Sequence, residues 1–261
     1  MPAPGVLFSF GLGYSAMALS RRLDAGGWQT RGTCRDPNRL RALSALGIKA
    51  ALFDGSEPMN PAGTLDGVTH VLLSIPPGDE GDLAFIHHAD MIAETGSVQW
   101  IGYLSTTGVY GNRDGAWVDE TSELCPGNPR SQRRVNAERT WLDWGARQGI
   151  ATHIFRLAGI YGPGRSVAEQ IKAGTARRIA KPGHVFSRIH IEDIATVLHH
   201  LGGYAQGFPT RQGQLSEWLV DQYSTHEVQT KEWMESKKPG HTTVQAKTKS
   251  EYLGPYEDYC W

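Results

Sequence analysis

An apolar strand, Val6-Leu7-Phe8-Ser9-Phe10, runs directly into a glycine-rich turn, Gly11-Leu12-Gly13-Tyr14-Ser15-Ala16. The turn has the G-x-G-x-x-A pattern: Gly11 permits a tight turn, Gly13 lets a pyrophosphate approach the backbone, and Ala16 lets the next helix pack closely. The helix predicted over residues 14–24 would then bind phosphates through the N–H groups at its start. All six residues of the turn are predicted to contact a dinucleotide. An ordinary strand-turn-helix unit without a ligand is the alternative.

The composition favours one medium-sized enzyme and excludes several other classes. With 261 residues and a net charge of −1, the chain has neither a basic field for nucleic acid nor an acidic tail. No apolar run approaches the length of a membrane span, and the first four residues lack the regions of a signal peptide. Cys34, Cys125 and Cys260 are scattered and odd in number, so they indicate neither a disulfide framework nor a zinc site. We therefore expect a cytoplasmic protein without a metal, a nucleic-acid partner or a membrane partner.

Strands and helices alternate along the first two thirds of the chain. Strands are predicted over residues 6–10, 29–33, 48–53, 69–74, 98–104 and 151–157, and helices over 14–24, 37–46, 82–95 and 130–148. Strands separated by helices of this size form a parallel sheet with helices on both faces. Right-handed crossovers then make a doubly wound sheet, which binds ligands beyond its C-terminal strand ends. The predicted fold class is therefore α/β.

The end of the second strand bears on the choice of cofactor. It lies about 20 residues past the glycines, where the residue that reads the ribose belongs. An acidic residue there would accept a hydrogen bond from the 2′-hydroxyl of NAD, whereas Arg35 offers a forked cation suited to the 2′-phosphate of NADP. Arg39, one helical turn further, is a second candidate for that phosphate. The sequence thus favours NADP; NAD is the alternative if Asp36 takes the ribose and Arg35 is only a solvated charge.

Two further strand ends supply candidate cofactor contacts. Asp54 follows the third strand, where an acceptor for the adenine edge would lie, although an Asp in such a position also caps turns. Ser74, Ile75 and Pro76 follow the fourth strand, where they would flank a ribose of the cofactor. A strand that simply ends at a proline is the alternative for these three residues.

Five further motifs follow in order. They are Ser105-Thr106-Thr107-Gly108-Val109-Tyr110-Gly111, Val118-Asp119-Glu120, Ala137-Glu138, Arg156 with Ile160-Tyr161-Gly162-Pro163-Gly164, and Arg188-Ile189-His190-Ile191-Glu192-Asp193-Ile194-Ala195. Together with the glycine turn, these motifs resemble the extended short-chain dehydrogenase/reductases, the NAD(P)-dependent epimerase/dehydratase family, and most of all its atypical YeeZ-like branch. The resemblance covers roughly residues 5–198. It implies a Rossmann sheet, a nicotinamide cofactor and a small-molecule substrate such as a nucleotide sugar.

The resemblance fails at the catalytic pair. The family places Tyr-x-x-x-Lys on the long helix after the fifth strand, where the Tyr transfers a proton and the Lys lowers its pKa. Counting back from Ala137-Glu138, these two positions hold Arg130 and Arg134. Arginine cannot act as an acid or base at neutral pH, because its pKa exceeds about 12. Thr106 matches the family's Ser or Thr and is our first catalytic candidate, followed by Tyr110 and Arg134.

The histidine pairs His87-His88 and His199-His200 point to different helix faces, so we interpret them as solvated residues rather than metal ligands. Neighbouring Asp119 and Glu120 are interpreted as loop caps. No site residue is therefore assigned to a metal.

The last sixty or so residues lack a sustained period of 2 or 3.6. We expect residues 1–198 to form the cofactor-binding domain, with part of the substrate region at about 159–190, and residues 199–261 to be divergent and weakly structured. A change of reading frame, a truncated natural end and a divergent helical cap are the explanations left open. Since the family builds much of its substrate pocket here, the resemblance does not identify the substrate.

The resemblance also implies a homodimer through the helices at 82–95 and 130–148. The second helix carries Val135, Trp141, Leu142 and Trp144, which either form that interface or pack on the sheet. Two hypotheses for function follow. One is an NADP-dependent oxidoreductase or epimerase-like enzyme acting on a carbonyl or hydroxyl group; the other is an NADP(H)-binding or redox-sensing module without turnover, which the missing Tyr-x-x-x-Lys pair favours.

Overall fold

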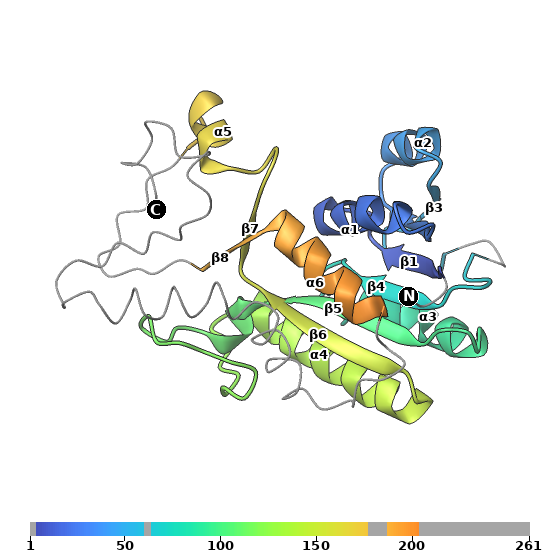
Figure 1. Ribbon diagram of the computed structural model, residues 1–261. Helices are drawn as coiled ribbons and strands as arrows, with labels where there is room; N and C mark the ends of the chain where they lie inside the picture. Colours follow the sequence, from blue (N-terminus) through green and yellow to red (C-terminus); the bar gives the residue numbers. More distant parts are fainter. Residues whose placement is uncertain (1–3, 60–63, 177–186, 204–261) are drawn as a thin grey trace. The chain divides into compact units, whose positions relative to one another are not determined.

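The computed structural model describes residues 4–59, 64–176 and 187–203, and its framework is a six-stranded parallel sheet (Figure 1). The strands are β1 (Val6–Phe10), β2 (Gln29–Cys34), β3 (Lys49–Leu52), β4 (His70–Leu73), β5 (Trp100–Thr106) and β6 (Ala151–Leu157). Their order is β3-β2-β1-β4-β5-β6, and each neighbouring pair is parallel. The order reverses between β1 and β4, and doubly wound sheets bind ligands at such a switch point. The predicted fold class is confirmed.

Helices cover both faces of the sheet. They are α1 (Tyr14–Asp24), α2 (Pro37–Ala45), α3 (Leu83–Glu94), α4 (Pro129–Gln148), α5 (Val167–Lys172) and α6 (Ile191–Gly203), with a short 3-10 helix η1 (Thr107–Tyr110) after β5. Helices α3 and α4 lie on one face of the sheet, and α1 and α6 lie on the other (Figure 1). Both layers are needed because strands of a parallel sheet are apolar on both sides.

Local sequence sets the helix ends. Asp36, Asp82 and Asn128 cap α2, α3 and α4 by accepting hydrogen bonds from backbone N–H groups of the first turn. Helix α4 ends at Gly149, whose left-handed φ of 68° suits a residue without a Cβ. These signals explain why the predicted helices agree with the observed ones to within one or two residues.

The main core fills the space between the sheet and helices α3 and α4. Alternate residues of neighbouring strands point into it, as the register of β1, β4 and β5 requires. Its central strand residues, all buried, are Phe8, Phe10, Val71, Leu73, Ile101 and Tyr103. Trp141 and Trp144 of α4 close this core from the helix side. The apolar residues that raised the possibility of a dimer interface are thus largely used inside the chain, since Val135 is buried as well.

A second, two-stranded parallel sheet follows the main one. It pairs β7 (Gly159–Tyr161) with β8 (Arg188–His190), and α6 begins directly after β8. No strand or helix was predicted in this region, because strands of three residues carry too little periodicity to be recognised.

Two differences from the expected boundaries bear on the site and on the extent of the domain. Strand β5 continues to Thr106, which still pairs with Leu157, so the strand ends two residues later than predicted. Helix α6 continues past residue 198 to Gly203, because Leu198 and Leu201 are buried against the rest of the unit. The chain divides into units at residues 1–210 and 211–261. The predicted divergent segment lies outside the described residues from position 204 onward.

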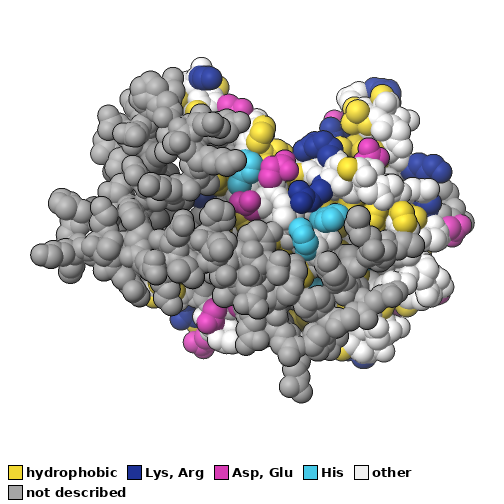
Figure 2. Space-filling view, viewed as in Figure 1, with side chains coloured by type: hydrophobic (Ala, Val, Ile, Leu, Met, Phe, Trp, Pro, Cys, Tyr) yellow, Lys and Arg dark blue, Asp and Glu magenta, His cyan; other side chains and the backbone are white. Residues whose placement is uncertain are grey.

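The surface of the described part gives two findings. None of its helices has the length and apolar character needed to cross a membrane. Figure 2 shows acidic, basic and histidine side chains interspersed on the face over α1 and α6.

Candidate functional site

The glycine turn joins β1 to α1 at the C-terminal edge of the sheet. Gly11 has a φ of 92°, and its N–H donates to the Thr33 hydroxyl at 2.9 Å. The next N–H, of Leu12, donates to the Thr33 carbonyl at 2.8 Å. A Cβ on Gly11 would lie 2.7 Å from Cγ2 of Ile75, so a side chain is excluded by the positive φ and by the contact. The turn is thereby fixed against β2 and against the segment after β4.

Gly13 is glycine for a different reason. Its φ of −88° suits any residue, and a Cβ added there would meet nothing within 4 Å. Within the described part of the chain, no side chain caps α1 at this residue, whereas α2, α3, α4 and α5 each have a capping side chain. No side-chain oxygen of the described residues therefore meets the first N–H groups of α1, at the positive end of the helix dipole.

The end of β2 presents two exposed arginines. Arg35 follows the strand directly, and Arg39 lies one turn into α2, close enough that its charge acts on the Cys34 thiol. Neither arginine forms an ion pair with another described residue. Asp36, the alternative ribose reader, is the N-cap of α2 and accepts from the Asn38 N–H at 2.8 Å through Oδ1. One oxygen of its carboxylate is therefore already engaged within the chain.

The other predicted cofactor contacts divide into two groups. Ser74 and Ile75 are brought against the glycine turn, since the Ser74 N–H donates to the Phe10 carbonyl at 3.0 Å. Asp54 instead holds its own loop: Oδ1 accepts from the Ser56 N–H at 2.9 Å and from its hydroxyl at 2.7 Å. These hydrogen bonds lower the pKa of Asp54. Its turn-capping role is thus visible, whereas Pro76 is exposed beyond the strand end.

Thr106 is the last residue of β5 and the N-cap of η1. Its hydroxyl oxygen accepts from the Gly108 N–H at 3.1 Å, and the residue is half-buried. A hydroxyl has one proton and two lone pairs, so this contact leaves the proton available for a second partner. Thr106 therefore stands at a strand end, on the edge that holds the glycine turn, with a donor to offer.

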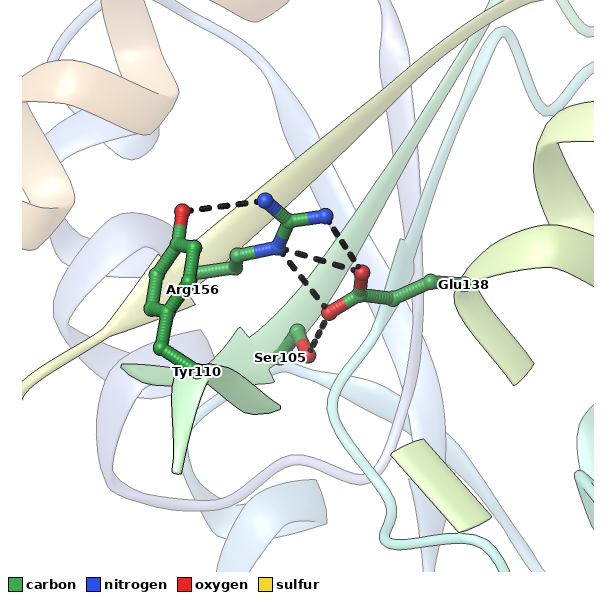
Figure 3. Close-up of polar contacts among 4 residues, drawn as sticks. All are labelled: Ser105, Tyr110, Glu138 and Arg156. Carbon is green, nitrogen blue, oxygen red and sulfur yellow. Dashed lines mark hydrogen bonds and ion pairs between the residues drawn. The ribbon is translucent and has the colours of Figure 1, made fainter. Parts of the chain in front are cut away.

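A buried polar network lies beside Thr106 (Figure 3). Glu138 of α4 is 1% exposed and accepts from the Ser105 hydroxyl and from Arg156 of β6, whose Nη2 lies 2.8 Å from Oε2. The Arg156 Nη1 donates to the Tyr110 hydroxyl at 2.9 Å, and its guanidinium carbon lies 5.1 Å from that ring's centroid. The ion pair joins α4 to β6, and its hydrogen bonds to Ser105 and Tyr110 add β5 and η1.

In this network the Tyr110 side chain is buried and hydrogen-bonded, whereas a catalytic tyrosine must present its hydroxyl to the substrate. Tyr110 is 5% exposed, and its hydroxyl oxygen is occupied by the Arg156 guanidinium. Arg134 is occupied as well: Nη1 donates to the Leu104 carbonyl at 2.6 Å and to the Tyr103 hydroxyl at 3.3 Å. Tyr103 is fully buried, and burial raises its pKa. The Tyr110 hydroxyl and the Arg134 guanidinium are therefore each hydrogen-bonded within the chain.

Glu138 and Arg156, which form the ion pair, both belong to motifs quoted from the sequence. Their pairing was not predicted from the sequence. The available signal was the place of Glu138 on α4, three residues from both Val135 and Trp141 and so on the buried side of the helix. A carboxylate on such a face requires a cation, and Arg156 on the adjacent strand supplies it.

Two other predictions concern possible ligand groups. The interpretation of His88 as solvated is wrong: it is 1% exposed, its Nε2 accepts from the Met59 N–H at 2.9 Å, and burial lowers its pKa to about 4. Asp119 is a loop cap, as expected, because it accepts from Thr121 and Ser122. Among the described residues, no group of three or more potential ligand side chains could hold a metal ion.

A glycine turn at the switch point of a doubly wound sheet, followed by a helix without a capping side chain among the described residues, is the arrangement of a Rossmann fold. No family model matches the chain. It is 30% identical over 195 residues to Protein YeeZ of Escherichia coli (strain K12), and the match covers 70% of this chain and 68% of that protein. The chain therefore belongs to the YeeZ family.

Solved structures share the fold of this chain. A functionally unknown conserved protein from Silicibacter pomeroyi DSS is 48% identical, with a TM-score of 0.69 over 78% of this chain and 70% of that one. MoeE5 in complex with UDP-glucose and NAD is 22% identical, with a TM-score of 0.62 over 77% and 72% of the two chains. UDP-N-acetylglucosamine 4-epimerase from Bacillus cereus is 14% identical, with a TM-score of 0.60 over 79% and 74%. The last two similarities support the fold alone.

Proposed function

We propose that this protein binds NADP(H) at the glycine turn and uses it in oxidoreductase or epimerase-like chemistry on a carbonyl or hydroxyl group. The observation that carries the proposal is the open backbone at Gly13, where α1 begins without a capping side chain among the described residues. Such a helix start binds the phosphates of a dinucleotide through its N–H groups. Ser74, Ile75 and Pro76 would flank the cofactor, and Asp54 would offer its free carboxylate oxygen to the adenine.

The preference for NADP over NAD rests on Arg35 and Arg39. Both are exposed at the end of β2, and neither forms an ion pair in the described part of the chain. Two unpaired cations at this strand end suit a 2′-phosphate, and the forked guanidinium of Arg35 matches its oxygens. Asp36, whose Oδ1 caps α2, would read the ribose hydroxyl through its other carboxylate oxygen if NAD were the cofactor.

Thr106 is the residue proposed to hold the substrate. The bound cofactor would supply or accept a hydride, and the Thr106 hydroxyl would donate a hydrogen bond to the substrate oxygen at which charge develops. MoeE5 was solved with UDP-glucose, so a nucleotide sugar is the substrate class that we propose first. Arg134 and Tyr110 would position Thr106 indirectly, because their hydrogen bonds fix the end of β5 and the helix η1 that follows it.

A second function is favoured by the two arginines on α4. Arg130 and Arg134 stand where the family has its proton-transferring Tyr and its Lys, and Arg134 is bound to the Leu104 carbonyl. A protein that binds NADP(H) without turning it over would tolerate this replacement. It would serve as a cofactor-binding or redox-sensing module.

Titration with NADPH and NADH, followed by a turnover screen, separates these functions. We expect NADPH to bind more tightly and a carbonyl compound or nucleotide sugar to be turned over. Thr106→Ala should then lower turnover by about 10²-fold and leave NADPH affinity unchanged, since one donor to a developing charge is lost. Thr106→Ser, which keeps the hydroxyl, is the matched control. Turnover by neither the parent nor the variants, with NADPH still bound, would support the binding module.

We also propose that the protein acts in the cytoplasm as a homodimer, with residues from about 159 contributing to the substrate region. Because Trp141 and Trp144 are buried within the chain, a dimer would use the outer surfaces of α3 and α4, where Ile86 is 50% exposed. Light scattering at micromolar concentration should give the dimer mass, and a monomer mass would reject this arrangement.

A further inference from the structure

The turn formed by residues 162–165 follows β7 and is held rigidly. The Gly162 and Arg165 backbones exchange two hydrogen bonds, of 3.3 and 2.9 Å. The Glu169 carboxylate then accepts from the N–H groups of Gly164 and Ser166, at 2.8 and 3.0 Å. The backbone on either side of Arg165 is therefore fixed, although its side chain is exposed.

This turn lies directly against the start of α1. The hydroxyl of Tyr14, the first residue of α1, donates to the Pro163 carbonyl at 2.9 Å. A Cβ on Gly162 would lie 2.6 Å from the Tyr14 hydroxyl oxygen, so the turn approaches the ring too closely for a side chain there. Residues separated by 149 positions in the sequence are thereby brought together at the glycine turn.

The contact between Tyr14 and the turn of residues 162–165 places the Arg165 guanidinium near the glycine turn. The guanidinium carbon of Arg165 lies 5.7 Å from the centroid of the Tyr14 ring, within range of a cation–π interaction. Arg165 forms no ion pair with any described residue. Tyr14 adjoins Gly13, where a Cβ would meet nothing within 4 Å. An arginine without a carboxylate partner thus stands beside the open backbone of a dinucleotide fingerprint.

We propose that Arg165 is a side-chain ligand for the pyrophosphate of the bound dinucleotide. The inference rests on the proposed function and adds to it a contact from outside the β1-α1 unit. Tyr14 positions the arginine, through its hydrogen bond to Pro163 and through its ring. Guanidinium groups bind phosphate oxygens in a forked, charge-assisted manner, which the N–H groups of a helix start do not provide. The diphosphate of a nucleotide-sugar substrate has the same chemistry, and the experiment distinguishes the two.

The pyrophosphate is common to NADPH, NADH and ADP-ribose, so all three probes should respond together. Arg165→Ala should weaken each of them about tenfold or more, since a charge-assisted contact is lost. Arg165→Lys should lose less, because it keeps the charge without the fork. Arg35→Ala should weaken NADPH alone. The matched control is Arg147→Ala, which removes another exposed arginine from the last turn of α4, near the opposite edge of the sheet.

The results below are interpreted for variants whose melting temperature equals that of the parent protein. Equal losses for the three probes in Arg165→Ala, and none in Arg147→Ala, establish the contact. Unchanged affinities overturn it while leaving the proposed function in place. UDP-glucose is titrated as a fourth probe, and a loss confined to it would assign the arginine to the substrate diphosphate and also overturn the proposal. If the parent protein binds none of the three probes, the proposed function itself fails.

Discussion

The glycine turn and the end of β5 share one edge of the sheet but differ in how their polar groups are used. At the glycine turn, α1 begins without a capping side chain among the described residues, and Arg35 has no carboxylate partner there. At the end of β5, Glu138, Arg156 and Tyr110 form a closed network, and Arg134 is bound to a backbone carbonyl. Apart from the Thr106 hydroxyl proton, the polar side chains named at the end of β5 are paired within the chain, whereas those at the glycine turn are not. This difference is what we expect if the glycine turn binds a ligand.

The difference also separates the two candidate functions. Buried charges that are paired contribute to the fold, and their loss is costly because the remaining partner stays in the interior. Exposed donors without partners contribute little to the free energy of unfolding, and they stabilise the protein only when a ligand is bound to them. Substitutions in the two regions should therefore affect different properties of the protein: stability at the end of β5 and affinity at the glycine turn.

The largest effect is expected at the closed network. Glu138→Ala leaves Arg156 without its carboxylate in a largely buried place, so the free energy of unfolding should fall by about 3–5 kcal/mol. Urea unfolding followed by circular dichroism measures this change. Glu94→Ala, which removes an exposed carboxylate from α3, is the control. A loss no larger than that of the control would mean that the network does not hold β5, α4 and β6 together.

The next effect is a change in affinity without a loss of stability. Gly13→Asp supplies the missing N-cap of α1, so stability should rise by a few tenths of a kcal/mol or more. The new carboxylate would occupy the N–H groups and repel a pyrophosphate, so NADPH affinity should fall on the order of 10²-fold. Calorimetry measures both quantities. Gly127→Asp, at another position where a Cβ meets nothing within 4 Å, is the control. Binding of NADPH by the Gly13→Asp variant as tight as by the parent would contradict the assigned site.

The smallest of the three effects concerns the 2′-phosphate. Arg35→Ala removes one charge-assisted contact and should weaken NADPH by about 1.5–3 kcal/mol, with little change for NADH. Titration of both cofactors against the parent and the variant gives the difference. Equal losses for the two cofactors, or tighter NADH binding by the parent, would assign the ribose to Asp36 instead.

The sequence predicted the fold well because its signals are local. The strand of residues 6–10 and the glycines at 11 and 13 act within a few residues, and the structure has the elements where these signals place them. The caps Asp36 and Asp82, which the structure adds, are equally local. Strands β7 and β8 escaped prediction because each has only three residues and is defined by its partner. Helix α6 was missed although its sequence was quoted as a motif.

The candidate site was less predictable, since its contacts join distant segments. The strand-end position of Thr106 followed from the motif, but the occupation of Tyr110 by Arg156 depends on residues 46 positions apart. The Tyr14 contact with Pro163 spans 149 positions and leaves no periodic signal. At His88 the error concerned burial, because adjacent histidines were interpreted as solvated and one is enclosed by the core. Pairing and burial are properties of the folded chain, so residue type alone does not supply them.

The central place of β1 has a consequence for how the chain reaches this structure. Strand β1 pairs with β2 on one side and with β4 on the other, and in the second pairing Phe8 lies opposite Val71. One edge of an apolar strand therefore stays without hydrogen-bonding partners until more than sixty further residues have been synthesised. Parallel pairings at such separations form slowly, because loop closure must precede the contacts that reward it. During translation, the segment that carries the glycine turn is thus the one most in need of protection from association with other chains.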